Sequence, residues 1–186
     1  MRRAVFLDRD GVVNRAVLRD GKPYPPSSLA DLRLLPGVHE ACRMLREAGF
    51  ALILITNQPD IARGTANASE VGEIHSRLRR FLQLDDVRVC PHDDDARCDC
   101  RKPKPGLLFQ AAAKYGLDLP GCYLIGDRWR DIDAGHAAGC QTVWIDRRYA
   151  ERAPLRPPAA RVASCLEAAA WILRPKGLRE PDHLSL

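Results

Sequence analysis

Short apolar runs alternate with segments of helical periodicity along most of this 186-residue chain. The clearest run, ALILIT at residues 51–56, is apolar up to its threonine, which is typical of a central strand in a parallel sheet. The segment before it, residues 37–49, places Val38, Cys42 and Leu45 on one helical face and ends in glycine. Strands that alternate with helices are expected to be parallel and joined by right-handed crossovers. The sequence therefore predicts an α/β fold with a doubly wound, Rossmann-like parallel sheet.

The same patterns assign most of the chain to elements. Strands are predicted at residues 4–7, 51–56, 87–90, 122–125 and 142–145, and helices at residues 37–49, 69–82, 106–115, 131–138 and 164–173. Ser69 is the expected N-cap of its helix. We expect residues 1–186 to form one domain, because the length suits one core and no repeat is visible. Its core is predicted at about 4–149, followed by a loop at 150–162, the last helix, and a mobile tail at 174–186.

Charge and hydropathy narrow the class of partner. The net charge is +5, but Lys and Arg are spread along the chain without interleaved aromatic residues, which favours a small anionic ligand over nucleic acid. The apolar run at residues 4–7 is too short for a signal peptide, and no stretch approaches the length of a membrane span. We therefore expect a cytoplasmic protein with no membrane partner. A monomer is expected because no amphipathic surface or heptad demands a partner.

Polar residues follow three of the predicted strands where each strand ends. These stretches are LDRDG, LITN and IGDRWRD, and they supply Asp8, Asp10, Thr56, Asn57, Asp127 and Asp131. The carboxyl ends of parallel strands meet at one crevice, which is where such sheets bind ligands. Four carboxylates there would repel each other, and a hard cation such as Mg²⁺ would relieve the repulsion. Lys102 follows the strand at 87–90 by a short loop and could reach the same crevice.

Asp8 and Asp10 lie two positions apart at a strand end, so their side chains can point to the same side. One carboxylate can attack a phosphoryl group while the other handles the proton, giving an aspartyl-phosphate intermediate. Each motif taken singly is more often an ordinary turn or loop start. Their occurrence at successive strand ends, with a lysine between the last two, is difficult to obtain by chance.

A cysteine-rich stretch, CPHDDDARCDC, lies just before Lys102. Its ligand-type residues are Cys90, His92, Cys98 and Cys100. Three thiolates and an imidazole match a closed, structural zinc site, since four protein ligands leave no position for water. A disulfide from Cys90 to either later cysteine is the alternative. The aspartates at 93–95 are interpreted as a solvated loop tip rather than as ligands. The remaining cysteines are expected to be small buried hydrophobic residues, and they are Cys42, Cys122, Cys140 and Cys165.

Taken in order, these motifs resemble the haloacid dehalogenase (HAD) superfamily of phosphohydrolases, over roughly residues 4–149. The resemblance implies that Asp8 is the nucleophile and that Asp10 is first the general acid and then the base. It also implies that Mg²⁺ is held by Asp8, the backbone carbonyl of Asp10 and Asp127. Thr56 and Lys102 would hold the transferring phosphoryl group. Asp131 would orient the Mg²⁺ shell or Lys102.

The stretches FLDRDGVVN, TNQ…IARG and CPH…CDCRKPKPG are similar to the heptose bisphosphate phosphatase and histidinol phosphatase group of that superfamily. In that group the Cys-x-His…Cys-x-Cys loop binds Zn²⁺ beside an Arg-Lys pair. The resemblance implies that Arg101 contacts substrate, and it places four further residues at the sugar phosphate, namely Asn14, Asn57, Gln58 and Arg128. No cap domain is expected, because the segment after Asp10 has room only for a loop. This chain has Pro59-Asp60 where heptose bisphosphate phosphatases commonly have Ser-Gly, which bears on the sugar that fits.

These observations leave two classes of function. The first is a Mg²⁺-dependent phosphatase for a phosphorylated sugar, with the 7-phosphate of a heptose 1,7-bisphosphate as the substrate that the resemblance implies and histidinol phosphate as the alternative. The second is a non-catalytic zinc-binding interaction module. The second class leaves the acidic crevice unexplained.

Overall fold

The computed structural model describes residues 2–19, 21–26 and 28–175. Six strands form one sheet in the order β5-β4-β1-β6-β7-β8, and every neighbouring pair is parallel. The strands are β1 (Ala4–Leu7), β4 (Ala51–Asn57), β5 (Asp86–Cys90), β6 (Tyr123–Gly126), β7 (Gln141–Ile145) and β8 (Ala160–Val162). The predicted α/β fold with a Rossmann-like sheet is confirmed.

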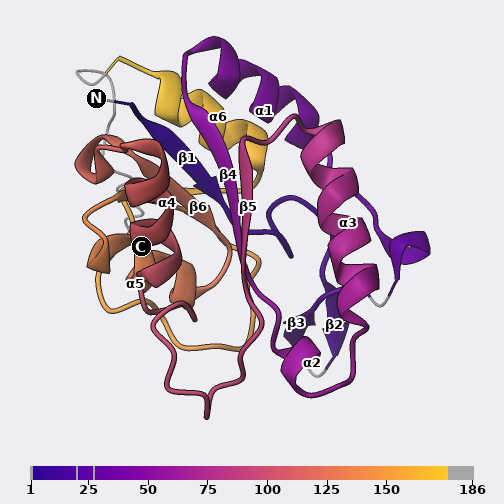
Figure 1. Ribbon diagram of the computed structural model, residues 1–186. Helices are drawn as coiled ribbons and strands as arrows, with labels where there is room; N and C mark the ends of the chain where they lie inside the picture. The colour runs from indigo at the N-terminus through magenta and orange to yellow at the C-terminus, as the bar shows by residue number, and fades with distance from the viewer. Residues whose placement is uncertain (1, 20, 27, 176–186) are drawn as a thin grey trace.

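Helices cover both faces of this sheet (Figure 1). One face packs against α1 (Val38–Glu47), α3 (Ala68–Phe81) and α6 (Cys165–Leu173). The other face packs against α4 (Gly106–Tyr115) and α5 (Trp129–Ala137). The shorter elements are α2 (Pro59–Ala62) and two 3-10 turns, η1 (Leu29–Asp31) and η2 (Leu119–Gly121).

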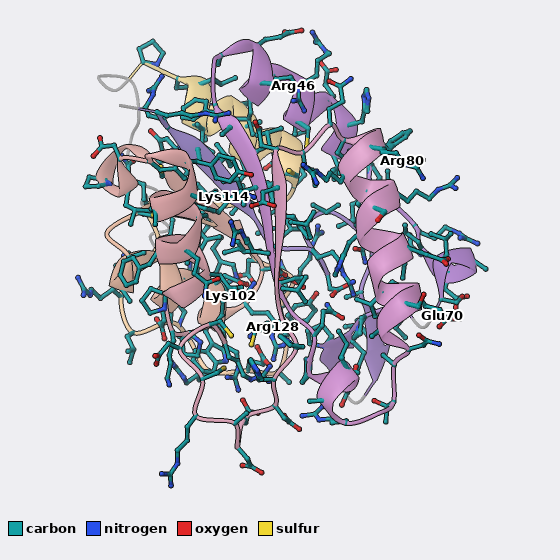
Figure 2. The ribbon with its side chains drawn as sticks, viewed as in Figure 1. Arg46, Glu70, Arg80, Lys102, Lys114 and Arg128 are labelled. Carbon is teal, nitrogen blue, oxygen red and sulfur yellow. The ribbon has the colours of Figure 1, made fainter. Side chains whose placement is uncertain are left out.

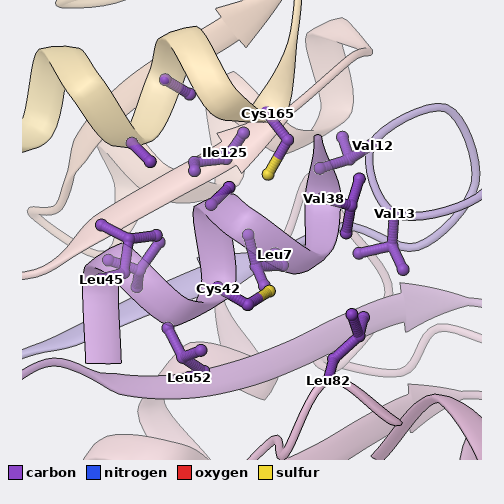
Figure 3. Close-up of a cluster of buried hydrophobic side chains, with 14 of the residues drawn as sticks. Leu7, Val12, Val13, Val38, Cys42, Leu45, Leu52, Leu82, Ile125 and Cys165 are labelled. Atoms are coloured by element: carbon purple, nitrogen blue, oxygen red, sulfur yellow. The ribbon is translucent and has the colours of Figure 1, made fainter. Parts of the chain in front are cut away.

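The period of two along β1 divides its side chains between two cores. Val5 and Leu7 belong to the core under α1 and α6, whereas Ala4 and Phe6 belong to the core under α4 and α5. Figure 3 shows the first core, where Leu7 lies close to Cys42 of α1. The four cysteines outside the predicted zinc site are buried, as predicted, and they are Cys42, Cys122, Cys140 and Cys165. Because β1 is buried on both faces, its position is fixed. The residues that follow it are therefore held at the carboxyl end of the sheet.

Besides the short helix α2, the two 3-10 turns and shifts of one or two residues at element ends, the structure differs from the sequence-based assignment in three places. Residues 160–162, predicted as loop, form β8 and extend the sheet beside β7. The segment after Asp10, also predicted as loop, contains an antiparallel hairpin of β2 (Val17–Arg19) and β3 (Lys22–Tyr24). The N-cap of α3 is Asn67, whose side chain accepts a hydrogen bond from the Ser69 amide. Strands of three residues give too little alternation to be read from a pattern.

Two further expectations concern the C-terminal tail and membrane spans. Most of the predicted mobile tail, residues 176–186, lies outside the described residues. Among the residues that are described, no helix is long and apolar enough to cross a membrane.

Candidate active site

A cavity of about 290 Å³ opens at the carboxyl end of the sheet, between the hairpin, the start of α2 and the loop that precedes α4. Its lining includes many of the predicted residues, namely Asp8, Asp10, Thr56, Asn57, Arg101, Lys102, Arg128 and Asp131. Figure 2 shows Lys102 and Arg128 near this end, whereas Arg46 and Lys114 lie toward the opposite end of the sheet. The topology therefore brings together side chains that are up to 123 residues apart, from Asp8 to Asp131.

Lys102 forms the centre of a buried charge cluster. Its Nζ lies 2.5 Å from Asp8 Oδ1 and 2.6 Å from Asp131 Oδ1, and it donates to the carbonyl of Ile55 at 3.1 Å. Only 2% of Lys102 is exposed. Burial alone would lower the pKa of this ammonium, but Asp131 and Asp8 outweigh it and the pKa is raised. Lys102 is therefore a permanent cation beside the Asp8 carboxylate.

The carboxylates here are costly to keep ionised without a further cation. Burial raises the pKa of Asp8 to about 6, although Lys102 opposes the rise. Burial, followed by the charges of Asp8 and Asp131, raises the pKa of Asp127 well above its usual value. Asp8, Asp127 and Asp131 each have one carboxylate oxygen within 4.8 Å of the corresponding oxygens of the other two. A divalent cation with oxygen ligands would stabilise this group, so the residues fit a Mg²⁺ site.

The two oxygens of Asp127 have different surroundings. Oδ2 accepts a hydrogen bond from the Tyr149 hydroxyl at 2.8 Å. Oδ1 is buried and has no donor among the described residues. Gly11 has a φ of 92°, and a Cβ at that position would collide with this carboxylate. Asp127 is thus held from one side with one acceptor left available, as expected of a metal ligand.

Asp10 is held by nitrogen donors that converge on its carboxylate. The Arg9 Nη2 lies 3.0 Å from Oδ2, and Arg9 Nε also donates to both oxygens. Asn14 Nδ2 donates to Oδ1 at 2.9 Å, and Gln58 Nε2 donates to Oδ2 at 3.0 Å. The carboxylate of Asp10 is not part of the acidic metal-type group, which agrees with a role for its backbone carbonyl.

Three predicted substrate contacts have other partners in this structure. Gln58 and Asn14 are buried and support Asp10, and Gln58 also donates to the Thr56 hydroxyl at 2.9 Å. The Asn57 amide pairs with the backbone of Lys102 in both directions, at 3.0 and 3.1 Å. Asn57 therefore joins the end of β4 to the loop that carries Lys102.

The ligand-type cluster in that loop assembles as predicted. Cys90 Sγ lies 3.2 Å from Cys100 Sγ and 3.8 Å from Cys98 Sγ, and His92 Nδ1 lies 3.3 Å from Cys100 Sγ. All seven cysteines are free thiols, so the structure has neither of the considered disulfides. Ligand atoms around a tetrahedral zinc lie about 3.8 Å apart. The donor set and its spacing therefore fit Zn²⁺.

The acidic loop tip is more than a solvated turn. Asp93 pairs with two nitrogens of Arg63 at 2.5 and 2.6 Å. Asp94 pairs with Arg101 at 2.8 Å and with Arg130 at 3.4 Å. Arg63, Arg101 and Arg130 all line the cavity, so these aspartates partly neutralise its basic rim. Arg128 belongs to the same rim and forms an ion pair with Glu151.

Sequence reasoning missed two kinds of residue. Tyr149 reaches Asp127 from a segment with no motif. Arg9 lies inside the recognised DRDG stretch, but its burial and its contact with His75 could not be read from it. An arginine between two aspartates at a buried strand end is the one signal that could have been followed.

Comparison with known proteins gives a consistent result. A family model described as HAD-hydrolase-like matches residues 99–169. The chain is 38% identical over 149 residues to a D-glycero-β-D-manno-heptose-1,7-bisphosphate 7-phosphatase of Pseudomonas aeruginosa, covering 77% of this chain and 81% of the relative. It is 32% identical over 182 residues to the Escherichia coli K12 protein of the same name, covering 91% and 87% of the two chains.

A solved structure agrees with these relatives. The D,D-heptose 1,7-bisphosphate phosphatase of B. bronchiseptica, complexed with magnesium and phosphate, superposes with a TM-score of 0.81 at 31% identity. The match covers 93% of this chain and 98% of that one, so the two proteins share their fold over nearly their whole length.

Proposed function

Because the chain belongs to the D-glycero-β-D-manno-heptose-1,7-bisphosphate 7-phosphatase family of HAD-type hydrolases, we propose that it removes the 7-phosphate of that bisphosphate. The observation that carries the proposal is the buried contact of Lys102 with Asp8 and Asp131, beside an Asp127 that keeps one oxygen available. A non-catalytic module would have no use for this cluster, because buried charges are costly unless they serve a function.

In the first half of the reaction, an Asp8 carboxylate oxygen attacks phosphorus and the bond from phosphorus to the sugar oxygen breaks. Asp10 gives its proton to that oxygen, so the sugar leaves as a neutral alcohol. The product on the enzyme is an aspartyl phosphate at Asp8. Lys102 and the Thr56 hydroxyl, which both line the cavity, neutralise and orient the phosphoryl oxygens.

In the second half, Asp10 takes a proton from a water molecule whose oxygen attacks phosphorus. The bond between phosphorus and Asp8 breaks, inorganic phosphate leaves, and both aspartates return to their starting states. Asp10 is suited to this role because Arg9, Asn14 and Gln58 hold its carboxylate at the cavity floor.

Two metals complete the proposal. Mg²⁺ would be held by Asp8, the Asp10 carbonyl and Asp127, and when bound it supplies positive charge that offsets the charge of the transferring phosphoryl group. Magnesium and phosphate are bound together in the B. bronchiseptica relative, which supports this assignment. Zn²⁺ would be held by Cys90, His92, Cys98 and Cys100. It would be structural, because these four ligands leave no open coordination position.

The second phosphate of the substrate needs its own basic contacts. Arg101 and Arg128 line the cavity outside the buried cluster and can bind phosphate through two nitrogens each. Both have acidic partners, Asp94 and Glu151, which substrate phosphate would have to replace or share. The cytoplasmic setting and the monomeric state stay predictions.

A substrate panel tests the reaction. Phosphate release is measured with both anomers of heptose 1,7-bisphosphate, histidinol phosphate, simple sugar phosphates and an aryl phosphate, with and without Mg²⁺. We expect Mg²⁺-dependent release with the β-anomer as the best substrate. Preference for histidinol phosphate would assign the acidic rim residue Asp60 to binding of an amine instead.

The nucleophile is tested with Asp8→Asn. The amide cannot form the aspartyl phosphate, so turnover should fall at least about a thousand-fold. Asp60→Asn, at the cavity rim, is the control and should stay active on the aryl phosphate. Full activity in the Asp8 variant would remove it as the nucleophile.

A further inference from the structure

Arg9 is the largest fully buried side chain among the described residues, with 1% of its surface exposed. It is the second residue after β1 and lies between Asp8 and Asp10 in the chain. A buried guanidinium is stable only when acceptors surround its N–H groups. Which acceptors Arg9 uses therefore determines how its plane is oriented.

The guanidinium has partners on two sides. Its Nε and Nη2 face the carboxylate of Asp10, at 3.0 to 3.2 Å. Its Nη1 lies 2.9 Å from Nε2 of His75, which comes from the middle of α3. Arginine has no acceptor atom, so His75 Nε2 must accept this hydrogen bond and the ring proton must be on Nδ1. Burial, followed by the charge of Arg9, lowers the pKa of His75 to about 4, in keeping with a neutral ring.

From this geometry we propose that His75 is a positioning residue for Asp10, acting through Arg9. His75 fixes the rotation of the guanidinium, and the guanidinium in turn presents two nitrogens to the Asp10 carboxylate. The inference rests on the proposed function, because it gives Asp10 the proton-transfer role. It adds α3, an element with no motif residue, to the parts of the fold that support the chemistry.

If His75 only filled space in the core, its replacement by an apolar side chain would not affect Asp10. Without an acceptor at position 75, the Nη1 of Arg9 would be a buried donor with no side-chain partner among the described residues, and the guanidinium would be expected to rotate toward another acceptor. Asn14 and Gln58 would still hold the other directions of Asp10. The expected effect is therefore a displaced, still ionisable Asp10 rather than an unfolded protein.

The test compares two leaving groups in His75→Leu. A sugar alkoxide needs a proton from Asp10 as it leaves, whereas p-nitrophenolate does not. We expect kcat to fall about ten-fold or more for the sugar phosphate that wild-type enzyme turns over fastest, with KM nearly unchanged. With p-nitrophenyl phosphate, formation of the aspartyl phosphate should stay fast while its hydrolysis slows, giving a burst of p-nitrophenolate before the steady state.

Two variants separate positioning from damage to the fold. His75→Gln can place an amide oxygen near the position of Nε2, so it should recover activity to within about three-fold of wild type. Ile74→Val perturbs the same helix in the adjacent buried position and should leave the leaving-group dependence unchanged. If His75→Leu gives no burst of p-nitrophenolate because formation of the aspartyl phosphate is itself slowed, or if Gln restores nothing, the proposal is wrong.

The wild-type enzyme provides a test that needs no variant. The ¹⁵N chemical shifts of the His75 ring report which nitrogen carries the proton. We expect Nδ1–H with an unprotonated Nε2 at neutral pH. A proton on Nε2 would exclude the Arg9 hydrogen bond and overturn the inference.

Asp10→Asn separates the proposed role of Asp10 from the proposed role of His75. If this variant keeps full activity, the role of Asp10 fails. If it is inactive and His75→Leu is normal, only the role of His75 fails.

Discussion

At the scale of single residues, the site depends on which carboxylate oxygens already accept a hydrogen bond from the protein and which do not. Asp8 and Asp131 each give one oxygen to Lys102, at 2.5 and 2.6 Å. Asp127 gives one oxygen to Tyr149 and keeps the other without a donor among the described residues. Asp8 and Asp127 are thus each oriented by one strong contact while acceptor capacity remains for a cation, whereas the second oxygen of Asp131 accepts a hydrogen bond from the Arg128 amide at 3.0 Å. Such supporting contacts commonly set how tightly a metal binds.

The Tyr149 hydroxyl provides the residue-scale prediction. In Tyr149→Phe the Asp127 carboxylate loses its only donor among the described side chains, so its preferred orientation weakens. We expect Mg²⁺ affinity to fall about ten-fold. Isothermal titration calorimetry with Mg²⁺ checks the affinity, and the Mg²⁺ concentration for half-maximal activity checks its effect on turnover.

Tyr115→Phe is the matched control, because the Tyr115 hydroxyl contacts the backbone of Asp85 and not the site. Equal Mg²⁺ affinity in the Tyr149 variant and wild type would show that the hydroxyl does not orient Asp127.

At the scale of elements, the loop between β5 and α4 connects the two metal-type sites. Cys90 ends β5, and the last cysteine of the cluster, Cys100, directly precedes Arg101 and Lys102. The loop also packs onto the start of α4, where a Cβ at Gly106 would collide with the carbonyl of Asp99. Zinc held by ligands up to Cys100 would restrict the backbone that, two residues later, aims Lys102 into the cavity.

Loss of one zinc ligand tests this coupling. Cys98→Ser removes a thiolate, so we expect loss of about one zinc per chain, a lower Tm and a fall in kcat/KM of about ten-fold or more. The reason is that Arg101 and Lys102 lose their fixed approach to substrate. Elemental analysis, thermal unfolding and steady-state kinetics measure the three effects.

Cys140→Ser is the control, because Cys140 is buried outside the cluster and should leave zinc content unchanged. A folded, zinc-free Cys98 variant with wild-type kcat and KM would contradict the coupling.

At the scale of the whole molecule, the parallel sheet concentrates negative charge at one end. Buried acidic side chains come from the ends of β1 and β6 and from α5, and Lys102 offsets only part of their charge. The folded state therefore includes electrostatic repulsion that the unfolded chain, with its separated carboxylates, lacks. A ligand that binds this end only in the folded state should stabilise the entire domain.

Mg²⁺ should accordingly raise the unfolding temperature. At about a hundred-fold excess over its Kd, a ligand of the native state contributes about 2.7 kcal/mol, which corresponds to a rise in Tm of about 5–10 °C for a domain of this size. Differential scanning calorimetry with MgCl₂, against NaCl of equal ionic strength, measures the shift. Asp127→Asn should reduce it, and the same Tm in both salts would argue against a Mg²⁺ site at these carboxylates.

Local patterns in the chain were enough to predict five of the six strands of the sheet, most helices and the groups at the strand ends. The run at 51–56 is β4 in the structure, and the Cys-x-His…Cys-x-Cys spacing predicts a cluster because its members are close in sequence. β8 was not predictable, since three residues after a proline-rich segment carry no period.

Contacts between distant residues required the folded chain. Arg9 and His75 are separated by 66 residues, and Tyr149 and Asp127 by 22, and neither pair belongs to a shared periodic pattern. Periodicity tells which face of a helix is buried, but not which strand end that face will cover. The packing of α3 against the sheet brings His75 to Arg9, and the course of the chain after β7 brings Tyr149 to Asp127. Motifs can therefore identify the reacting groups, whereas the residues that orient them are selected by how the layers pack.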